Sequence, residues 1–404
     1  TREVMEMEKV RSVLSGAAGY GAYYLQLLAE QVDQSRFVLA GIVDPFVKEV
    51  GSDWAKEKNV PLYRSLEDFY AADSADLAIL SCPIQFHKEQ ALLAMKNGSH
   101  VLCEKPLTVE IADALEMQAA AEKYGKYLAV GFQWSYCTPI LSLKKDILAG
   151  KFGQPRMLKT LISWQRFDNY YQGSSWKGRI HDANGFLIQD SVATNATAHY
   201  LHNLFFVMGD TLSTAAMPEE VRYSAWRAKE IESFDTCFAK GKFASGAEFL
   251  YIATHSGDRG IEPVFRYEFE DAAATLEEID GVPQLKVQYR DGRVEDYGMP
   301  QSDRSNSQKI TAMLDAIQNH DPSAVTCPVA ASLPHLAVCT GFFREGAIGN
   351  LPKDRIFRTE APAGTFVHGL ADECLVCYEQ GLLPSEAGLA WTAPETCFDP
   401  KRYL

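Results

Sequence analysis

Short apolar runs alternate with helical patterns through the first 131 residues of the chain. The runs lie at residues 10–14, 37–43, 76–82, 101–103 and 127–131, and each has the length and composition of a buried strand. The connections between them are long enough to cross over a sheet. Strands that alternate with helices in this way form a parallel sheet with helices on both faces. We therefore predict an N-terminal α/β domain with a doubly wound parallel sheet.

A glycine-rich turn joins the first run to the first helical pattern. It contains Gly16, Ala18, Gly19, Tyr20 and Gly21, so that an alanine stands where the dinucleotide fingerprint G-x-G-x-x-G has its middle glycine. Glycines at such a turn let the backbone approach a pyrophosphate held at a helix N-terminus. On its own, the stretch fits a tight strand-to-helix turn without a ligand equally well.

The second apolar run ends in an acid, Asp44, 23 residues after Gly21. An acid at this point is placed to hydrogen-bond the ribose hydroxyls of NAD, and it would repel the 2′-phosphate of NADP. No arginine follows to receive that phosphate, although Lys48 is near. The sequence therefore predicts NAD rather than NADP as the cofactor, with Asp44 as a strand-end turn residue the alternative.

An acid, a base and a proline, Glu104-Lys105-Pro106, follow the apolar run at 101–103 directly. A lysine at the C-terminal edge of a parallel strand lies where open α/β sheets bind ligands. There, desolvation and a nearby cationic ring lower the pKa of a lysine toward the range of proton transfer at neutral pH. As an isolated tripeptide, the same residues fit a solvated ion pair after any strand.

These features occur in one order and spacing that resembles the Gfo/Idh/MocA family, named after glucose-fructose oxidoreductase and inositol dehydrogenase. The resemblance includes a Pro83…His87 turn, and its motifs extend from about residue 10 to 210. It implies that Lys105 performs acid–base work beside the nicotinamide and that Glu104 and Pro106 shape the cofactor pocket. It also implies a cofactor-side position for Pro83 and His87, while a surface histidine at a helix start remains an alternative for His87.

The pattern changes after residue 131. Several runs rich in Thr, Val, Ile, Phe and Tyr, separated by glycine-containing turns, predict a mostly antiparallel sheet. We expect a Rossmann domain at residues 1–131 and an α+β domain at 132–404, an open-faced sheet with helices that binds substrate and forms oligomer contacts. Helices are predicted at about 307–319 and 330–345.

A second polar cluster lies on a helix predicted from residue 194 to 208. The family usually places an Asp, a His four residues later and an acid three residues after that. Here Asn195, His199 and His202 take these positions. Because an asparagine cannot act as a carboxylate base, Asp190 is the candidate to supply the charge. An N-cap role for Asn195 and a packing or oligomer-contact role for His202 stay open, and no metal is expected.

Four further side chains are candidates for substrate contact. The family commonly has an arginine-containing run where this chain has Gln133 and Trp134, which suit stacking on and hydrogen-bonding a sugar ring but equally suit a core position. Trp176 and Arg179 precede the second cluster and complete the set.

Composition narrows the partners and the compartment. The net charge is −14, from 39 basic and 53 acidic residues without a basic run, which argues against nucleic acid and anionic membranes. No apolar run reaches the length of a membrane span, and residues 1–9 lack the apolar core of a signal peptide. Several of the nine cysteines, Cys82, Cys103 and Cys339 among them, lie in apolar runs and fit reduced, buried positions. The pair Cys374 and Cys377 fits helix packing, with a zinc or redox site as the alternative. We expect a cytoplasmic homo-oligomer, a dimer or tetramer.

Taken together, the residues and the resemblance predict an NAD-dependent oxidoreductase acting on a secondary alcohol of a sugar, polyol or sugar derivative. Two alternatives stay open. One is a redox-assisted glycosidase or lyase that recycles NAD. The other is a non-catalytic sugar-binding homologue. The Asn195 substitution favours this alternative, and the intact Glu104-Lys105-Pro106 argues against it.

Overall fold

The chain forms two compact units. The computed structural model describes residues 8–46, 49–300, 305–392 and 395–404. The first unit is built from Thr1–Cys137 and Gln301–Ser332, and the second from Thr138–Pro300 and Leu333–Leu404. The chain first passes from the first unit to the second after Cys137, close to the boundary predicted at residue 131. The return of the chain to the first unit through helix α9 (Ser305–Asn319) differs from the prediction, which had assigned this helix to the second domain.

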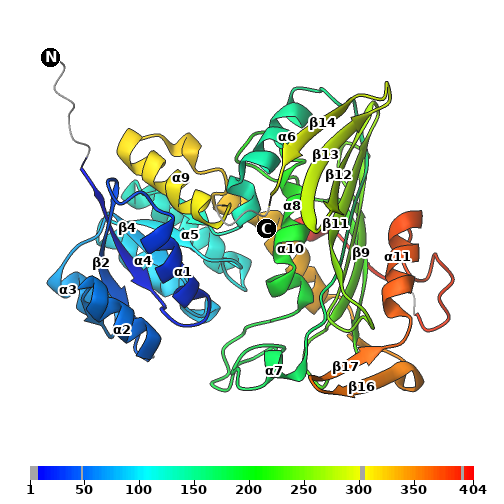
Figure 1. Ribbon diagram of the computed structural model, residues 1–404, viewed down its shortest axis with the longest axis horizontal. Helices are drawn as coiled ribbons and strands as arrows, with labels where there is room; N and C mark the ends of the chain where they lie inside the picture. Colours follow the sequence, from blue (N-terminus) through cyan, green and yellow to red (C-terminus); the bar gives the residue numbers. More distant parts are fainter. Residues whose placement is uncertain (1–7, 47–48, 301–304, 393–394) are drawn as a thin grey trace. The chain divides into compact units, whose positions relative to one another are not determined.

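The first unit contains a six-stranded, wholly parallel sheet in the order β3-β2-β1-β4-β5-β6. It lies in the blue-to-cyan part of Figure 1. Its strands are β1 (Val10–Ser15), β2 (Phe37–Val43), β3 (Leu62–Tyr63), β4 (Leu77–Leu80), β5 (His100–Cys103) and β6 (Leu128–Val130). The order reverses between β1 and β4, which makes their carboxyl ends the topological switch point where such sheets bind ligands. The predicted doubly wound sheet is confirmed.

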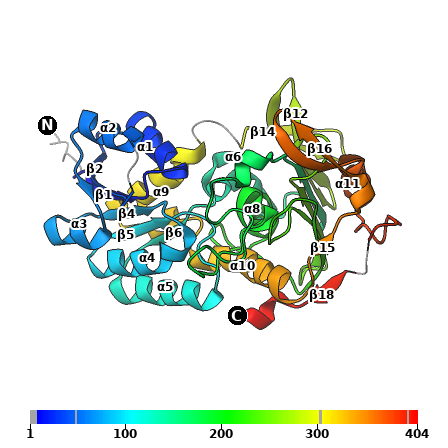
Figure 2. The ribbon, with the colours of Figure 1, turned by 90° about the horizontal axis from the view of Figure 1, so that it is seen from below.

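Helices cover both faces of this sheet. In Figure 2, α1, α2 and α9 lie on one face and α3, α4 and α5 on the other. Their bounds are α1 (Tyr20–Glu30), α2 (Glu49–Lys58), α3 (Leu66–Ala72), α4 (His87–Lys96) and α5 (Ile111–Tyr124). Burial on both faces explains why the strands read as unbroken apolar runs; all four residues of β4 have zero exposure.

The second unit is built on a ten-stranded, mostly antiparallel sheet. Nine strands follow the order β14-β13-β12-β11-β7-β10-β9-β8-β15, and β18 pairs with β8. The β7–β10 and β8–β15 pairs are parallel. The strands are β7 (Pro155–Ser163), β8 (Glu220–Arg227), β9 (Thr236–Lys242), β10 (Glu248–Thr254), β11 (Ile261–Phe269), β12 (Ala272–Ile279), β13 (Val282–Tyr289), β14 (Val294–Gly298), β15 (Gly349–Asn350) and β18 (Thr396–Phe398).

Both faces of the middle of this sheet are covered. Alternate residues of β10 point to opposite sides: Phe249 contacts Phe205 of α8 (Ala198–Phe206), whereas Leu250 and Ile252 belong to a core cluster with residues of α11 (Leu370–Gln380). The remaining elements are helices α6 (Thr138–Leu148), α7 (Asp168–Tyr171) and α10 (Val329–Arg344) and the hairpin β16 (Ile356–Glu360)–β17 (Ala363–Val367). The predicted α+β architecture is confirmed.

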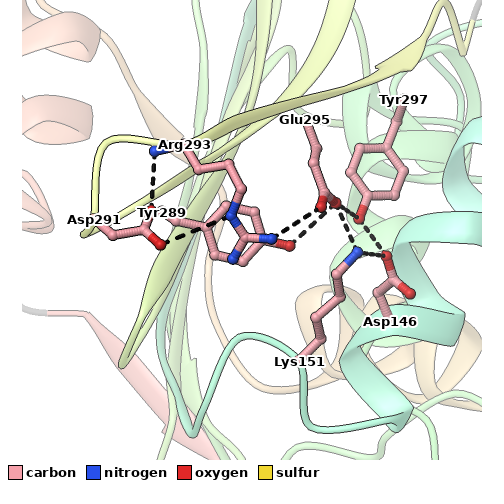
Figure 3. A network of polar contacts seen from close by, with 7 residues as sticks. All are labelled: Asp146, Lys151, Tyr289, Asp291, Arg293, Glu295 and Tyr297. Atoms are coloured by element: carbon pink, nitrogen blue, oxygen red, sulfur yellow. Dashed lines mark hydrogen bonds and ion pairs between the residues drawn. The ribbon is translucent and has the colours of Figure 1, made fainter.

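A polar network ties α6 to the far edge of the sheet. The Lys151 ammonium lies 2.9 Å from Asp146 at the end of α6 and 2.7 Å from Glu295 of β14, and Tyr297 donates to Asp146 (Figure 3). These groups are a quarter or more exposed, so the network fixes the position of the edge and contributes little stability.

All nine cysteines are free, and Cys374 and Cys377 are residues of α11 that belong to its core cluster. Among the described residues, no helix has the length and apolar character needed to cross a membrane. The same residues contain no group of three or more His, Cys, Asp or Glu side chains that could hold a metal ion.

Candidate functional site

The glycine-rich loop lies at the switch point of the first sheet. Gly16 has φ +88°, and a Cβ there would lie 2.6 Å from the carbonyl oxygen of Ser81, the residue that follows β4. A Cβ on Gly21 would lie 2.0 Å from the carbonyl oxygen of Gly16. Both positions therefore require glycine, because any side chain would push the loop away from the sheet.

The middle of the loop is open. Ala18, Gly19 and Tyr20 are exposed, and α1 begins here without a capping side chain from the described residues. The N–H groups of its first turn are the donors that hold a pyrophosphate in dinucleotide-binding folds. Ala18 leaves this arrangement intact, since it faces solvent rather than the sheet. The residues present fit a dinucleotide.

Asp44 lies beside the loop. Its Oδ2 accepts a hydrogen bond of 2.9 Å from the N–H of Ala17, and its Oδ1 accepts one of 2.9 Å from the N–H of Phe46. A carboxylate oxygen has two lone pairs, so each oxygen keeps one acceptor site for a ribose hydroxyl. Asp44 thus orders the loop as well as lying where the ribose is expected. Lys48, the nearest cation in the sequence, is outside the described residues.

His87 joins two loops at the carboxyl edge of the sheet. It is 2% exposed at the start of α4, so the surface alternative is wrong. Its Nε2 lies 2.9 Å from the carbonyl oxygen of Cys82, and its Nδ1 lies 3.0 Å from that of Leu107 and 3.2 Å from that of Pro106. Burial lowers the pKa of this imidazole, although the carbonyls oppose the shift. His87 therefore fixes the turn after β4 to the turn after β5.

Glu104 is the centre of a buried network. It is 6% exposed, and its Oε1 accepts hydrogen bonds from Tyr24 (2.6 Å) and from the ammonium of Lys309 on α9. Its Oε2 accepts a hydrogen bond of 3.1 Å from the backbone N–H of Lys105. A Cβ on Gly131 would lie 2.8 Å from the same carboxylate, so the glycine makes room for it.

Charge pairing keeps Glu104 ionised. Burial alone would raise the pKa of its carboxyl, but the Lys309 ammonium and the Tyr24 hydroxyl outweigh that effect and hold the pKa below its usual value. Lys309 has no exposed side-chain surface, and its ammonium lies 4.9 Å from the centre of the Tyr24 ring. A buried charge is stable only when paired in this manner. The pair therefore holds the backbone of Lys105 in one position at the C-terminal edge of β5.

Lys105 itself is half-buried, and its peptide bond to Pro106 is cis. Its side chain extends from the turn that Glu104 and His87 fix from either side. A lysine at a backbone position fixed in this way can exchange a proton with a hydroxyl that comes within hydrogen-bond distance of its amine.

The second cluster begins differently from the predicted helix. Residues Val192–Ala196 form a π-helical turn that starts from Ser191, and the regular helix α8 begins only at Ala198. Ser191 and Thr194 cap the turn reciprocally, with hydrogen bonds of 3.2 and 2.8 Å to each other's N–H. The alternative N-cap role for Asn195 is wrong, because Ser191 caps the turn and Thr197 stands at the N-cap of α8. Such turns occur frequently at functional sites.

Asp190 directly precedes Ser191, the residue that caps the π-helical turn. Asp190 is buried, and its Oδ2 accepts a hydrogen bond of 2.6 Å from the N–H of Gly178. Asn195 and His199 are half-buried on the turn and the helix that follow. His202 is fully buried and stacks on Phe206 at 5.6 Å, which makes it a packing residue.

Comparison with known proteins agrees with this geometry. Residues 10–132 match the family described as an oxidoreductase family with an NAD-binding Rossmann fold. This match identifies residues 10–132 as similar to the NAD-binding domain of the Gfo/Idh/MocA oxidoreductase family. The resemblance drawn from the motifs is confirmed, as is the expectation of an NAD-binding domain; preference for NAD over NADP stays a prediction.

Curated relatives and solved structures extend the match beyond this domain. The scyllo-inositol 2-dehydrogenase (NADP(+)) IolU of Bacillus subtilis is 25% identical over 281 residues, 68% of this chain and 79% of that protein. The 2,7-anhydro-N-acetylneuraminate hydratase of Mediterraneibacter gnavus is 26% identical over 291 residues, 68% of this chain and 71% of that protein. Two other curated relatives are matched over only 37% and 52% of their length.

One solved structure supports the fold of both units. The WlbA dehydrogenase from Bordetella pertussis, in complex with NADH and UDP-GlcNAcA, has a TM-score of 0.66 and 21% identity. The match covers 83% of this chain and 96% of that one.

The four candidate substrate contacts have different environments. Trp134 is 1% exposed, whereas Gln133 and Trp176 are half-buried, and the Tyr20 hydroxyl lies 3.5 Å from the Gln133 amide oxygen. Arg179 is exposed and lies 3.9 Å from Glu232. The structure leaves the substrate role of all four as a prediction.

Sequence reasoning missed Lys309, the partner of Glu104. A signal was present: Lys309, Met313 and Ala316 lie at helical spacing and are all buried, so the lysine occupies the apolar face of α9. A lysine on such a face indicates a buried acid opposite it, but the sequence does not say which one.

Proposed function

We propose that this chain is an NAD-dependent dehydrogenase of a sugar, polyol or sugar derivative, which oxidises a secondary alcohol or reduces the corresponding ketone. The observation that carries the proposal is Lys105, held by Glu104 and His87 at the carboxyl edge of a sheet whose switch point bears an open dinucleotide loop. The inositol dehydrogenase among the relatives acts on a ring of secondary alcohols, which is the same substrate class.

Each residue has a distinct task in this proposal. Bound NAD supplies the hydride acceptor or donor. Lys105 exchanges the proton of the substrate hydroxyl, and His199 holds that hydroxyl or shares its proton. Asp190, next to the Ser191 cap, provides the carboxylate that Asn195 cannot, while Asn195 orients the substrate through its amide.

Reduction of NAD over a panel of sugars, polyols and amino sugars tests the proposal. We expect reduced nicotinamide to accumulate with at least one ring substrate that has a free secondary hydroxyl. The product should be the ketone, detectable by mass spectrometry as a loss of two hydrogens. If NAD binds but no member of the panel is oxidised and no ketone is reduced, the chain is a non-catalytic homologue and the proposal fails.

A second candidate function has one specific observation in its favour. A relative of similar coverage is named as a hydratase, and its substrate is an anhydro sugar. A redox-assisted lyase or hydratase on this fold would recycle NAD within each turnover, so that product forms without net accumulation of reduced cofactor. The stoichiometry of reduced nicotinamide to product, one for a dehydrogenase and zero for this alternative, separates the two.

We also place the enzyme in the cytoplasm as a homo-oligomer, a dimer or tetramer. All nine cysteines are free, which fits a reducing compartment. Light scattering of the purified chain measures the oligomeric state directly.

A further inference from the structure

Two cations of the second unit, neither in an ion pair with a described carboxylate, meet at one aromatic ring. Arg166 follows the end of β7, and its guanidinium carbon lies 4.9 Å from the centre of the Tyr170 ring. The ammonium of Lys177 lies 4.1 Å from the same centre. Both side chains are half-buried. Within the described part of the chain, neither one forms an ion pair with an Asp or Glu side chain.

This arrangement is unusual for an acidic chain. Acidic residues outnumber basic ones 53 to 39, and Arg179, two residues beyond Lys177, has a carboxylate within 4 Å. Desolvation of a cation costs free energy unless an anion compensates it. Burial lowers the pKa of Lys177, the charge of Asp190 opposes that shift, and the charge of Arg166 adds to it. The two cations are therefore close enough to repel each other.

The backbone holds the first of these cations rigidly. The N–H groups of Trp164 and Arg166 donate to the carbonyls of Thr254 and His255 at 3.0 and 3.2 Å, which extends the β7–β10 pairing past the end of both strands. The Nε atom of Arg166 is buried without a hydrogen-bond partner among the described residues. A second unpartnered donor or acceptor lies close by: Nε2 of His255, whose Nδ1 lies 3.0 Å from the Tyr171 hydroxyl.

The pair lies beside the second polar cluster. Arg166 stacks on Trp164 at 5.4 Å, and the Trp164 ring contacts that of Tyr200 edge-on at 5.6 Å. Tyr200 is the residue after His199. The charge of Asp190 acts on both Lys177 and Tyr170. The cations therefore adjoin the residues proposed to touch the substrate.

We propose that Arg166 and Lys177 recognise an anionic oxygen group, a carboxylate or a phosphate, carried by the sugar-like substrate. The guanidinium offers paired N–H donors for two oxygens, and the ammonium adds a mobile point charge. The anion would add charge compensation to that of Asp190, which acts on Lys177 without forming an ion pair with it. This inference rests on the proposed function, since it names the class of substrate that the dehydrogenase accepts.

The test compares neutral and anionic forms of the same sugar in the presence of NAD. Calorimetric titration with glucose, glucuronate and glucose 6-phosphate, and with inositol and inositol 1-phosphate, measures binding without requiring turnover. We expect at least one anionic member to bind on the order of tenfold to a hundredfold tighter than its neutral counterpart, the range for hydrogen bonds to charged groups. The carboxylate and phosphate arms show which group is preferred. Equal binding of neutral and anionic members, or no binding of any anionic member, overturns the inference.

Charge-changing variants then locate the effect. Arg166→Gln and Lys177→Gln should each remove most of the preference for the anion, and the charge-preserving Arg166→Lys and Lys177→Arg should retain part of it. Arg266→Gln is the matched control, because Arg266 is an exposed arginine of the same unit paired with Glu268. A preference that survives both Gln variants, or is lost equally in the control, contradicts the assignment. If the chain prefers the anionic ligand but reduces NAD with no substrate, the proposed dehydrogenase activity is refuted, whereas the proposed anion site is supported.

Discussion

Removal of the Lys309 ammonium tests the network that holds the turn containing Lys105. In Lys309→Met the methionine fills a similar volume, but Glu104, only 6% exposed, loses its charge partner. Loss of one partner of a buried ion pair costs about 3–5 kcal/mol. Because Tyr24 and the N–H of Lys105 still donate to the carboxylate, we expect the lower end, about 3 kcal/mol. For a unit of this size that is a fall in Tm of roughly 6–12 °C.

The difference in stability between the native chain and Lys309→Met should change with pH in a defined direction. In the native chain the pKa of Glu104 is lowered, so its ionised form stabilises the fold above the unfolded pKa and this contribution is lost as pH falls. Without Lys309, burial dominates and raises the pKa of Glu104 above the unfolded value. The variant then loses stability as pH rises through the unfolded pKa of about 4.3. The stability gap between the two proteins should therefore widen between about pH 4 and 7.

Scanning calorimetry with and without NAD measures this gap, since NAD identifies the transition of the first unit. Lys88→Met is the matched control: Lys88 is partly exposed on the same unit, 2.7 Å from Asp113, and its loss should cost no more than about 1 kcal/mol. The double variant Glu104→Gln/Lys309→Met should recover much of the loss, because no charge is left unpaired. If Lys309→Met is no worse than the control, or the gap narrows as pH rises, the reasoning is wrong.

Three further predictions concern the cofactor loop and the second cluster. Asp44→Ala should weaken NAD more than NADP and so remove a preference of at least tenfold, about 1.4 kcal/mol; equal titration curves in the native chain would contradict this. Gly16→Ala should abolish NAD binding in calorimetry, because the methyl group would lie 2.6 Å from a backbone oxygen at φ +88°. An unchanged affinity for NAD would contradict the role of this loop in cofactor binding. Asp190→Asn should lower kcat nearly as much as His199→Ala, with little further loss in the double variant; a silent Asp190→Asn would exclude their joint action.

The sequence contains enough information to predict the first unit and its motifs. Apolar runs such as residues 76–82 identify strands because both faces of the parallel sheet are covered. The glycine positions follow from contacts with backbone atoms, as at Gly16, and Glu104-Lys105-Pro106 lies at the end of β5 as predicted. Local patterns are sufficient wherever one short segment determines the geometry.

Other features depend on distant residues or on exposed edges. The Glu104–Lys309 pair joins positions 205 residues apart, and no local pattern identifies such a partner. The π-helical turn at Val192–Ala196 was missed because the apolar spacing is compatible with an uninterrupted helix, and the reciprocal Ser191–Thr194 cap decides where it begins. Strand β14 (Val294–Gly298) has no apolar run to identify it in the sequence, since its residues are mostly polar and its burial is slight.

The most direct test of the central claim is the kinetics and cofactor affinity of Lys105→Ala, measured together on the substrate that the panel identifies. The loop and Asp44, which we expect to hold the cofactor, are separate from the Lys105 side chain, so NAD should bind with nearly native affinity in calorimetry. Turnover should fall by roughly 10²–10⁴, the range for loss of a general acid–base group. Native turnover in this variant would contradict the account, because it would assign the proton transfer to another residue.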